Sequence, residues 1–508
     1  ENNGFVLAAI KTGMKLGKAD YEATTFGFAE MNKGVLLLEA AKTANAQQFG
    51  DLPDSLVQQE KTLQKKQSSL TAKLVEKRPE VEKDSLRSVL NGINQEIDVF
   101  TNMLKSKFPK YAALKYGNKT VTAKEIQAQL DDKTALLEYM IGDSVIYVFY
   151  VDKKQVKLTP IYLSNKVLNE KIKALHSTLS DYKLAVKEPV VSYRKYTENA
   201  FWFYENLIAP ALKSAKGINK LIIVSDGELG HLPFEAFLTK SAPQKETDYN
   251  ELSYLFNDYS ISYNYAATLW KASKEAPKNK NNGQLLAMAS NYEFKIDSSK
   301  MTQEQSLRAS LNPLPAAREE IEALKEHFNG FFAFDKAASE KNFKEKAGNY
   351  AVIHLAMHGL LDNKNPILSS LAFTEDGDSL ENNFLHAYEI SKMKLNADLV
   401  ILSACETGFG RFDKGNGIAS LAQAFAYAGA PAMIVSLWQV NDFATSEIMK
   451  NLYQNLAKGM KKDEALRQAK LDYIKKVGGI GVHPAFWSPF ILMGNTDCLL
   501  YTSDAADE

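Results

Sequence analysis

Cysteine is nearly absent from this sequence. Among 508 residues there are only two, Cys405 and Cys498, too few for a disulfide framework or a structural zinc site. An excess of one charge is absent too, because Lys plus Arg and Asp plus Glu each total 61. This balance gives no sign of nucleic-acid binding or of an acidic solvating tail. No run of about 18 apolar residues occurs, so we expect no membrane span.

The start of the sequence shows no recognisable signal peptide. No basic stretch followed by an apolar one opens the sequence, and we expect a cytoplasmic protein. The chain starts without methionine, so we interpret it as a fragment and leave a secretion signal upstream open. Residues 497–508 resemble translated sequencing-adapter read-through and are expected to be non-native, with a short native tail as the alternative. If this tail is non-native, Cys405 is the only genuine cysteine.

Residues 1–112 have a helical pattern. Leu63, Leu70 and Leu74 are spaced by seven and four in a stretch rich in Lys, Glu and Gln, which indicates a long amphipathic hairpin or a short coiled coil. We interpret the charges of this stretch as a solvated face. The length of the chain already suggests more than one domain. We therefore predict a separate helical segment over residues 1–112.

From residue 134 onward the pattern changes to strands. β-branched and aromatic runs flank Gly142-Asp143, which predicts a hairpin. Continuous apolar strands then alternate with helices, and residues 444–477 are predicted to form one long helix. The predicted strands are residues 221–224, 284–289, 330–333, 350–356, 397–403 and 432–437. This alternation predicts an α/β domain over residues 113–496, with a mostly parallel sheet covered by helices on both faces. We divide it into a β-rich and helical part, 113–216, and a catalytic part, 217–496.

Two of the predicted strands end on reactive residues. His358 follows strand 350–356, Cys405 follows strand 397–403, and the two are 47 residues apart, which leaves room for a crossover connection. Ligands of open parallel sheets bind beyond the carboxyl ends of the strands, so neighbouring strands would bring both side chains together. A Cys405 thiolate could then attack a carbonyl carbon while His358 carries the proton. The N–H groups of Gly359 and Cys405 are the candidates for stabilising the oxyanion.

The same residues also have simpler interpretations. A lone cysteine after an apolar strand is usually a small buried hydrophobe, and a lone histidine is usually structural. His354 and His358 stand four apart, a spacing that brings two metal ligands together on a helix rather than on a strand. No glutamate occupies the second position of an HExxH motif either. We therefore expect no metal site, and we expect His354 to be a core residue or a support for the site.

The motifs around these residues resemble the CHAT family, caspase-like peptidases that are commonly fused to tetratricopeptide repeats. Ile353-His354-Leu355-Ala356-Met357-His358-Gly359 resembles the histidine motif of the family, and Val400-Ile401-Leu402-Ser403-Ala404-Cys405-Glu406-Thr407-Gly408 resembles its cysteine motif. Further matches are Asp226-Gly227, Leu232-Pro233-Phe234-Glu235-Ala236, Pro313-Leu314-Pro315, Asn365-Pro366, Ser436-Leu437-Trp438-Gln439-Val440-Asn441-Asp442 and His483-Pro484. The resemblance covers roughly residues 134–494.

The resemblance implies a caspase-like α/β fold, related to that of separases, and peptide-bond hydrolysis by a His358/Cys405 dyad without metal or organic cofactor. It also implies that residues 1–112 contain the remnant of a repeat array that binds partners, although no clean repeat period is visible. Met357 stands where the family commonly has a small polar residue. The cysteine motif also differs from the caspase form, so aspartate specificity is not implied.

Two aspartates are candidates for a specificity pocket. Asp226 ends strand 221–224 and Asp442 follows strand 432–437, and either carboxylate could select arginine or lysine by a charge-assisted pair. The simpler interpretations are a turn residue before Gly227 for Asp226 and a helix N-cap for Asp442.

The predicted function is a cysteine endopeptidase that cleaves a protein or peptide substrate. A regulatory protein bound by the helical N-terminal part is the second expected partner, and neither nucleic acid nor a membrane is expected. A catalytically silent interaction scaffold is the alternative. A hydrolase acting on small-molecule esters or amides is a third possibility, which would need a deep apolar pocket.

Overall fold

The computed structural model describes most of the chain, in segments separated by gaps. The described residues are 2–16, 21–31, 33–34, 52–75, 79–108, 111, 120–243, 247–275, 283–292, 310–377, 381–403, 411–413, 417–419 and 421–499. The contacts divide the chain into two compact units, residues 38–119 and residues 1–37 with 120–508. Among the described residues, no helix combines the length and the apolar character that crossing a membrane needs.

The smaller unit is built on two long helices, α4 (Asp54–Val75) and α5 (Glu80–Lys107). The amide of Gln67 donates a hydrogen bond to Asn94 Oδ1 (2.8 Å), which links the helices in an antiparallel hairpin. Leu63 and Leu104 are buried at its base, where Tyr111 donates a hydrogen bond to Glu60 (2.5 Å). The leucine spacing therefore predicted this hairpin correctly.

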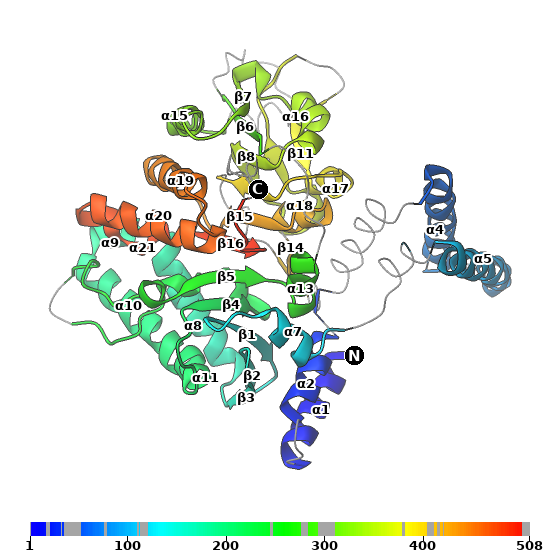
Figure 1. Ribbon diagram of the computed structural model, residues 1–508, viewed down its shortest axis with the longest axis horizontal. Coiled ribbons are helices and arrows are strands. Elements are labelled where there is room, and N and C mark those ends of the chain that lie inside the picture. Colours follow the sequence, from blue (N-terminus) through cyan, green and yellow to red (C-terminus); the bar gives the residue numbers. More distant parts are fainter. Residues whose placement is uncertain are drawn as a thin grey trace, which may run out of the picture. The chain divides into compact units, whose positions relative to one another are not determined.

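The larger unit contains an 11-stranded sheet in the order β3-β2-β1-β4-β5-β16-β15-β12-β8-β6-β7, and its labels run from β3 to β7 across Figure 1. The strands are β1 (Thr134–Ile141), β2 (Ile146–Val151), β3 (Val156–Ile161), β4 (Lys220–Val224), β5 (Ser260–Asn264), β6 (Leu285–Ala289), β7 (Gly330–Phe334), β8 (Val352–Ala356), β12 (Leu399–Leu402), β15 (Ala432–Ser436) and β16 (Phe490–Gly494). Most neighbouring pairs are parallel, which confirms the predicted α/β class.

Helices cover both faces of this sheet. On β1, Ala135, Leu137 and Tyr139 face one apolar cluster, whereas Leu136 and Met140 face another. The helices described after residue 120 are α7 (Ala123–Gln129), α8 (Asn165–Ser180), α9 (Lys183–Lys187), α10 (Pro189–Phe203), α11 (Ala209–Leu212), α12 (Leu255–Asp258), α13 (Ala267–Glu275), α15 (Pro315–Leu324), α16 (Glu340–Lys346), α17 (Ala387–Ile390), α18 (Leu421–Tyr427), α19 (Asp442–Ala457), α20 (Lys462–Lys476) and α21 (Pro484–Trp487). Burial on both faces explains why the strands are continuous apolar runs.

The direction of the strands reverses in the middle of the sheet, between β16 and β15, and β2 near one edge is antiparallel to both of its neighbours. β16 is parallel to β5 but antiparallel to β15, whereas β15, β12, β8, β6 and β7 are parallel to one another. In one half of the sheet β1, β4, β5 and β16 therefore run in one direction, and in the other half all five strands run in the opposite direction. As a result, the carboxyl ends of β4 and β5 lie at one edge of the sheet, and those of β8, β12 and β15 lie at the other.

The predicted long helix over residues 444–477 is wrong. α19 ends at Ala457 and α20 begins at Lys462, and Gly459 between them adopts a positive φ of 78°. A left-handed conformation at a glycine is a common way to end a helix, because the missing Cβ removes the steric penalty. Antiparallel packing of α19 on α20 is possible only because of this break.

Helices α1 (Asn2–Leu16) and α2 (Tyr21–Glu30) belong to the same compact unit as the large sheet. Phe26 packs edge-on against Phe149 of β2, and the Glu30 carboxylate accepts hydrogen bonds from the first N–H groups of α13, at Ala267 (2.9 Å) and Thr268 (2.6 Å). A carboxylate at this end of a helix is stabilised by the helix dipole. The predicted boundary between residues 112 and 113 lies outside the described residues and stays a prediction.

Two small sheets and the C-terminal residues complete the described structure. β9 (His358–Leu360), β10 (Ser370–Ala372) and β11 (Phe384–His386) form an antiparallel sheet, and β13 (Arg411–Asp413) pairs with β14 (Gly417–Ala419). Asp497 forms an ion pair with Lys274 (2.5 Å), and Leu499 is buried. Residues 500–508 lie outside the described residues, so the expected non-native origin of 497–508 stays a prediction.

Candidate functional site

His358 begins β9 directly after the carboxyl end of β8. Its side chain is buried, and its Nε2 lies 2.7 Å from the backbone oxygen of Asn312. Because a carbonyl oxygen can only accept a hydrogen bond, Nε2 must carry the proton in this contact. The neutral imidazole therefore keeps Nδ1 as its unprotonated nitrogen. This is the atom that can accept a proton from a nucleophile.

Tyr292 contacts both the backbone and the ring of His358. Its hydroxyl accepts a hydrogen bond from the His358 N–H (2.9 Å) and donates one to the backbone oxygen of Ala372 (2.6 Å). The two rings are tilted, with centroids 4.8 Å apart. Sequence reasoning missed Tyr292, although it follows the carboxyl end of predicted strand 284–289, and that position could have been a signal.

His354 is fully buried below this edge of the sheet. Its Nε2 lies 2.6 Å from Glu320 Oε1 and 3.1 Å from Ser403 Oγ, and its Nδ1 lies 3.0 Å from the hydroxyl of Tyr453. Both ring nitrogens are thus occupied by side chains from α15, α19 and the end of β12. His354 is a core residue, as expected, and its ring is not available to share a metal ion with His358.

Asp442 lies at the same edge, as the first residue of α19. The N-cap of this helix is Asn441, whose side-chain oxygen accepts a hydrogen bond from the Ala444 N–H (3.2 Å), so the cap interpretation of Asp442 is wrong. Burial raises the pKa of the Asp442 carboxyl, a protonated His358 imidazole would oppose the shift, and Glu320 adds to it. Asp442 is therefore a half-buried carboxylate within electrostatic reach of His358.

A groove of about 520 Å³ opens beside Asp442. It lies between the turn that joins α8 to α9, the loop that joins β15 to α19, and helix α21. Its lining residues are Ser180, Asp181, Tyr182, Lys183, Trp438, Gln439, Val440, Asn441, Asp442, Ala485 and Phe486. Trp438 is fixed by a hydrogen bond from its indole N–H to the backbone oxygen of Ala485 (3.0 Å). The groove offers aromatic surface and two carboxylates to a bound chain.

The family model of the CHAT domain matches residues 197–495, more than half of the chain. The chain belongs to the CHAT family. This confirms the resemblance seen in the histidine and cysteine motifs.

Curated relatives of this CHAT protein are named as repeat proteins. Tetratricopeptide repeat protein 28 of Mus musculus is 28% identical over 127 residues, which cover 25% of this chain and 5% of the relative. Its Homo sapiens counterpart is 25% identical over 333 residues, which cover 58% of this chain and 13% of the relative. The CHAT chain thus spans only a small part of the curated relatives that it matches.

Two solved structures resemble the fold of this CHAT protein distantly. A Saccharomyces cerevisiae separase–securin complex matches with a TM-score of 0.46 at 9% identity, over 76% of this chain and 31% of the other. The Arg-specific cysteine proteinase gingipain R matches with a TM-score of 0.38 at 10% identity, over 66% of this chain and 76% of the other. Nothing about the chemistry of this chain follows from such distant likeness.

The structure does not bring Asp226 to the edge of the CHAT sheet at which His358 lies. Asp226 follows β4, in the half of the sheet that runs in the opposite direction, and a five-residue strand spans roughly 16 Å. Its carboxylate accepts hydrogen bonds from the N–H groups of Ile141 (2.7 Å) and Gly227 (3.0 Å). Gly227 has a positive φ of 58°. The geometry agrees with the turn interpretation of Asp226.

Cys405 is the predicted nucleophile, and the N–H groups of Gly359 and Cys405 are the predicted oxyanion donors. Cys405 lies outside the described residues. Gly359 lies in β9, next to His358, and pairs with Leu371 of β10. The roles of Cys405 and Gly359 therefore stay predictions.

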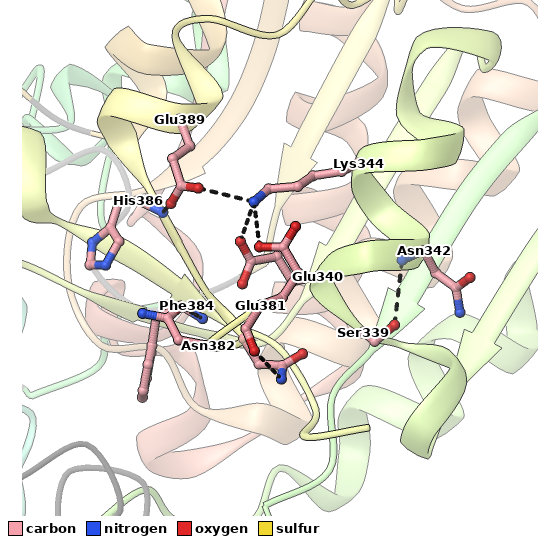
Figure 2. Close-up of polar contacts among 10 residues, drawn as sticks. Ser339, Glu340, Asn342, Lys344, Glu381, Asn382, Phe384, His386 and Glu389 are labelled. Carbon is pink, nitrogen blue, oxygen red and sulfur yellow. Dashed lines mark hydrogen bonds and ion pairs between the residues drawn. The ribbon is translucent and has the colours of Figure 1, made fainter. Parts of the chain in front are cut away.

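Three carboxylates gather near the small sheet of the CHAT domain, as Figure 2 shows. Oxygens of Glu340, Glu381 and Glu389 lie within 4.8 Å of one another, an arrangement that could hold a cation. The Lys344 ammonium already lies between them, at 2.7, 2.8 and 3.0 Å. Burial alone would lower the pKa of Lys344, but its hydrogen bonds to the three carboxylates raise it. The chain thus supplies its own cation here, and the cluster ties α16 to α17.

Proposed function

We propose that this CHAT domain is a cysteine endopeptidase with Cys405 as nucleophile and His358 as base. The observation that carries the proposal is the register between β8 and β12. Ile401 pairs with His354 and Leu402 with Leu355, an offset of 47 residues. Cys405 and His358 are separated by the same 47 residues. The register therefore supports a position of Cys405 opposite His358, beyond the carboxyl ends of both strands.

The proposed reaction begins with proton transfer from the Cys405 thiol to Nδ1 of His358. The thiolate then attacks the carbonyl carbon of the scissile bond, and the N–H groups of Gly359 and Cys405 stabilise the oxyanion. When the tetrahedral intermediate collapses, the C–N bond breaks and His358 donates its proton to the leaving amine. Water hydrolyses the resulting thioester with His358 as base. The Asn312 carbonyl supports each step, because it keeps the other proton on Nε2.

We also propose that Asp442 selects arginine or lysine on the amino side of the cleaved bond. Replacing Asp442 with asparagine is expected to lower the preference for arginine over glutamine by about 10- to 100-fold, because one charge-assisted hydrogen bond is lost. The ratio of kcat/KM for two peptides that differ only at this residue measures the effect. Acidification should lower the preference of the wild type for arginine, because it neutralises the Asp442 carboxylate. Burial raises the pKa of Asp442, so this loss should occur at a higher pH than it would with an ordinary aspartate.

Asp226→Asn is the comparison variant for this prediction. The substitution is the same, and Asp226 lies at the opposite edge of the sheet, so the arginine preference should stay unchanged. A larger loss of preference in Asp226→Asn than in Asp442→Asn would contradict the assignment of Asp442.

A covalent probe tests the proposed peptidase activity directly. A peptidyl acyloxymethyl ketone with arginine next to the reactive group is expected to modify Cys405 once per chain, as mapped by mass spectrometry. Cys498, which is half-buried, reports unspecific thiol reactivity in the same sample. Equal modification of both cysteines, or none at any probe concentration, would contradict a catalytic Cys405 and favour an interaction scaffold.

The helical residues in the first 112 positions are proposed to bind a regulatory protein. The support is the helical structure of α1, α2, α4 and α5, together with the names of the curated relatives as tetratricopeptide repeat proteins. Because α1 and α2 belong to the same compact unit as the large sheet, a partner bound to them would be connected to the peptidase domain.

A further inference from the structure

We infer that Tyr292 is a positioning residue for His358, which rests on the proposed peptidase function. Tyr292 follows β6, the neighbour of β8 on the side away from β12, and its side chain is 4% exposed. Tyr292 acts on three features of His358: the position of its backbone, the tilt of its ring and, through both, the direction of Nδ1. No other described side chain hydrogen-bonds to the His358 backbone N–H.

The Tyr292 hydroxyl bridges two residues that face each other in the small sheet. His358 pairs with Ala372 in the antiparallel register of β9 and β10. The hydroxyl accepts from the His358 N–H (2.9 Å) and donates to the Ala372 oxygen (2.6 Å), so that it lies between the two groups. The hydroxyl therefore sets the distance between β9 and β10 at this pair of residues. Without it, His358 would either lose a backbone partner or move toward Ala372.

The ring of Tyr292 restrains the imidazole from one side. The centroids of the two rings are 4.8 Å apart, and the angle between the ring planes is 49°. The backbone oxygen of Asn312 accepts a hydrogen bond from the Nε2–H group of the imidazole. Tyrosine packing and the carbonyl contact together limit rotation of the imidazole. Misplacement of a catalytic group by about 1 Å can cost roughly 100-fold in rate, so this restraint is large enough to matter.

A direct chemical role of Tyr292 is not needed. Its proton is donated to Ala372 and its oxygen accepts from His358, so the hydroxyl is already engaged in both directions. Tyr292 therefore acts through His358 and is not itself an acid toward the substrate. A phenylalanine at this position keeps the ring and removes only the bridge, which makes Tyr292→Phe the informative substitution.

The test compares Tyr292→Phe with Tyr196→Phe, both in a Cys498→Ser background. Tyr196 is a matched control, because its buried hydroxyl also donates to a backbone oxygen, that of Ala236, at 2.6 Å. Tyr292→Phe is expected to lower kcat about 10- to 100-fold with KM changed less than about twofold. A second readout is the pH at which iodoacetamide alkylates Cys405 at half its maximal rate. In Tyr292→Phe this pH should rise toward the value measured for His358→Ala. Tyr196→Phe should change neither value.

Three outcomes are decisive. If Tyr292→Phe keeps kcat within about twofold of the control, or loses activity without moving the alkylation midpoint, the positioning role is overturned.

If the wild type itself neither cleaves peptides nor takes up the covalent probe, the proposed peptidase function fails. In that case ¹⁵N-histidine NMR still tests Tyr292, because the proportion of the Nε2-protonated tautomer of His358 should fall in Tyr292→Phe. An unchanged proportion would overturn the inference independently of activity.

Discussion

Replacing His358 with alanine is expected to lower kcat/KM for peptide cleavage by about 10²- to 10⁴-fold, the range typical of a lost general base. The reason is geometric. The Asn312 carbonyl holds the proton on Nε2, so Nδ1 is the one nitrogen of the neutral ring that can take a proton. In the proposed mechanism, removing the ring leaves Cys405 without this acceptor and the leaving amine without its proton donor. Steady-state cleavage of an arginine-containing peptide measures the loss.

His386→Ala is a control of the same size in the same small sheet. His386 ends β11, and its Nδ1 lies 2.9 Å from the backbone oxygen of Leu368. Its position is visible in Figure 2, beside the Lys344 cluster rather than at the carboxyl end of β8. Activity of His386→Ala should stay close to the wild type. If His358→Ala and His386→Ala lose activity equally, disruption of the sheet rather than loss of a base explains the effect.

Replacing Lys470 with methionine is expected to lower the free energy of unfolding by about 3–5 kcal/mol, because it leaves a buried carboxylate unpaired. Lys470 of α20 lies 3.4 Å from Glu235, and both side chains are almost completely buried. Burial lowers the pKa of Lys470, and Glu235 opposes this shift. Without the ammonium, the hydrogen bond that the Glu235 carboxylate keeps within the described part of the chain is the one from the hydroxyl of Tyr263.

Tryptophan fluorescence during urea unfolding measures this effect in the relevant unit. All four tryptophans of the chain, Trp202, Trp270, Trp438 and Trp487, belong to the larger unit. Its unfolding is therefore followed without a signal from residues 38–119.

Two further variants distinguish the effect of breaking the buried ion pair on stability from the effect of losing any lysine. Lys153→Met removes a lysine whose ion pair with Asp132 is largely exposed, and it should cost less than about 1 kcal/mol. The double variant Glu235→Gln/Lys470→Met should recover most of the lost stability, because neither charge is then buried alone. A double variant as unstable as Lys470→Met would contradict the charge argument and point to packing of the lysine stem.

The sequence predicted β6, β7, β8, β12 and β15, and with them the carboxyl edge on which His358 lies. These strands are continuous apolar runs, and such runs are visible locally because a strand buried on both faces needs no polar position. Of the strands in the large sheet it missed β3, which lies at an edge, and β5 and β16, which lie at the centre. β5 reads Ser-Ile-Ser-Tyr-Asn, in which polar residues interrupt the apolar pattern although all five are buried.

The two missed central strands decide which aspartate lies near the site. β16 pairs parallel to β5 and antiparallel to β15, so β4, which is parallel to β5, runs opposite to β15. Asp226 and Asp442 therefore end up at opposite edges, although each follows an apolar strand in the sequence. The direction of a strand depends on a partner far away in the chain, and no local pattern contains it.

The sequence alone thus determined the family, the α/β class and the motif that carries His358, because these depend on local hydrophobic patterns and on residue order. Only the tertiary structure decided what surrounds His358. Tyr292 and Asn312 reach it from residues 66 and 46 positions away, and the Glu235–Lys470 pair joins residues 235 positions apart. Such contacts form when the sheet assembles, because a polar group that becomes buried is stabilised by a partner from another part of the chain.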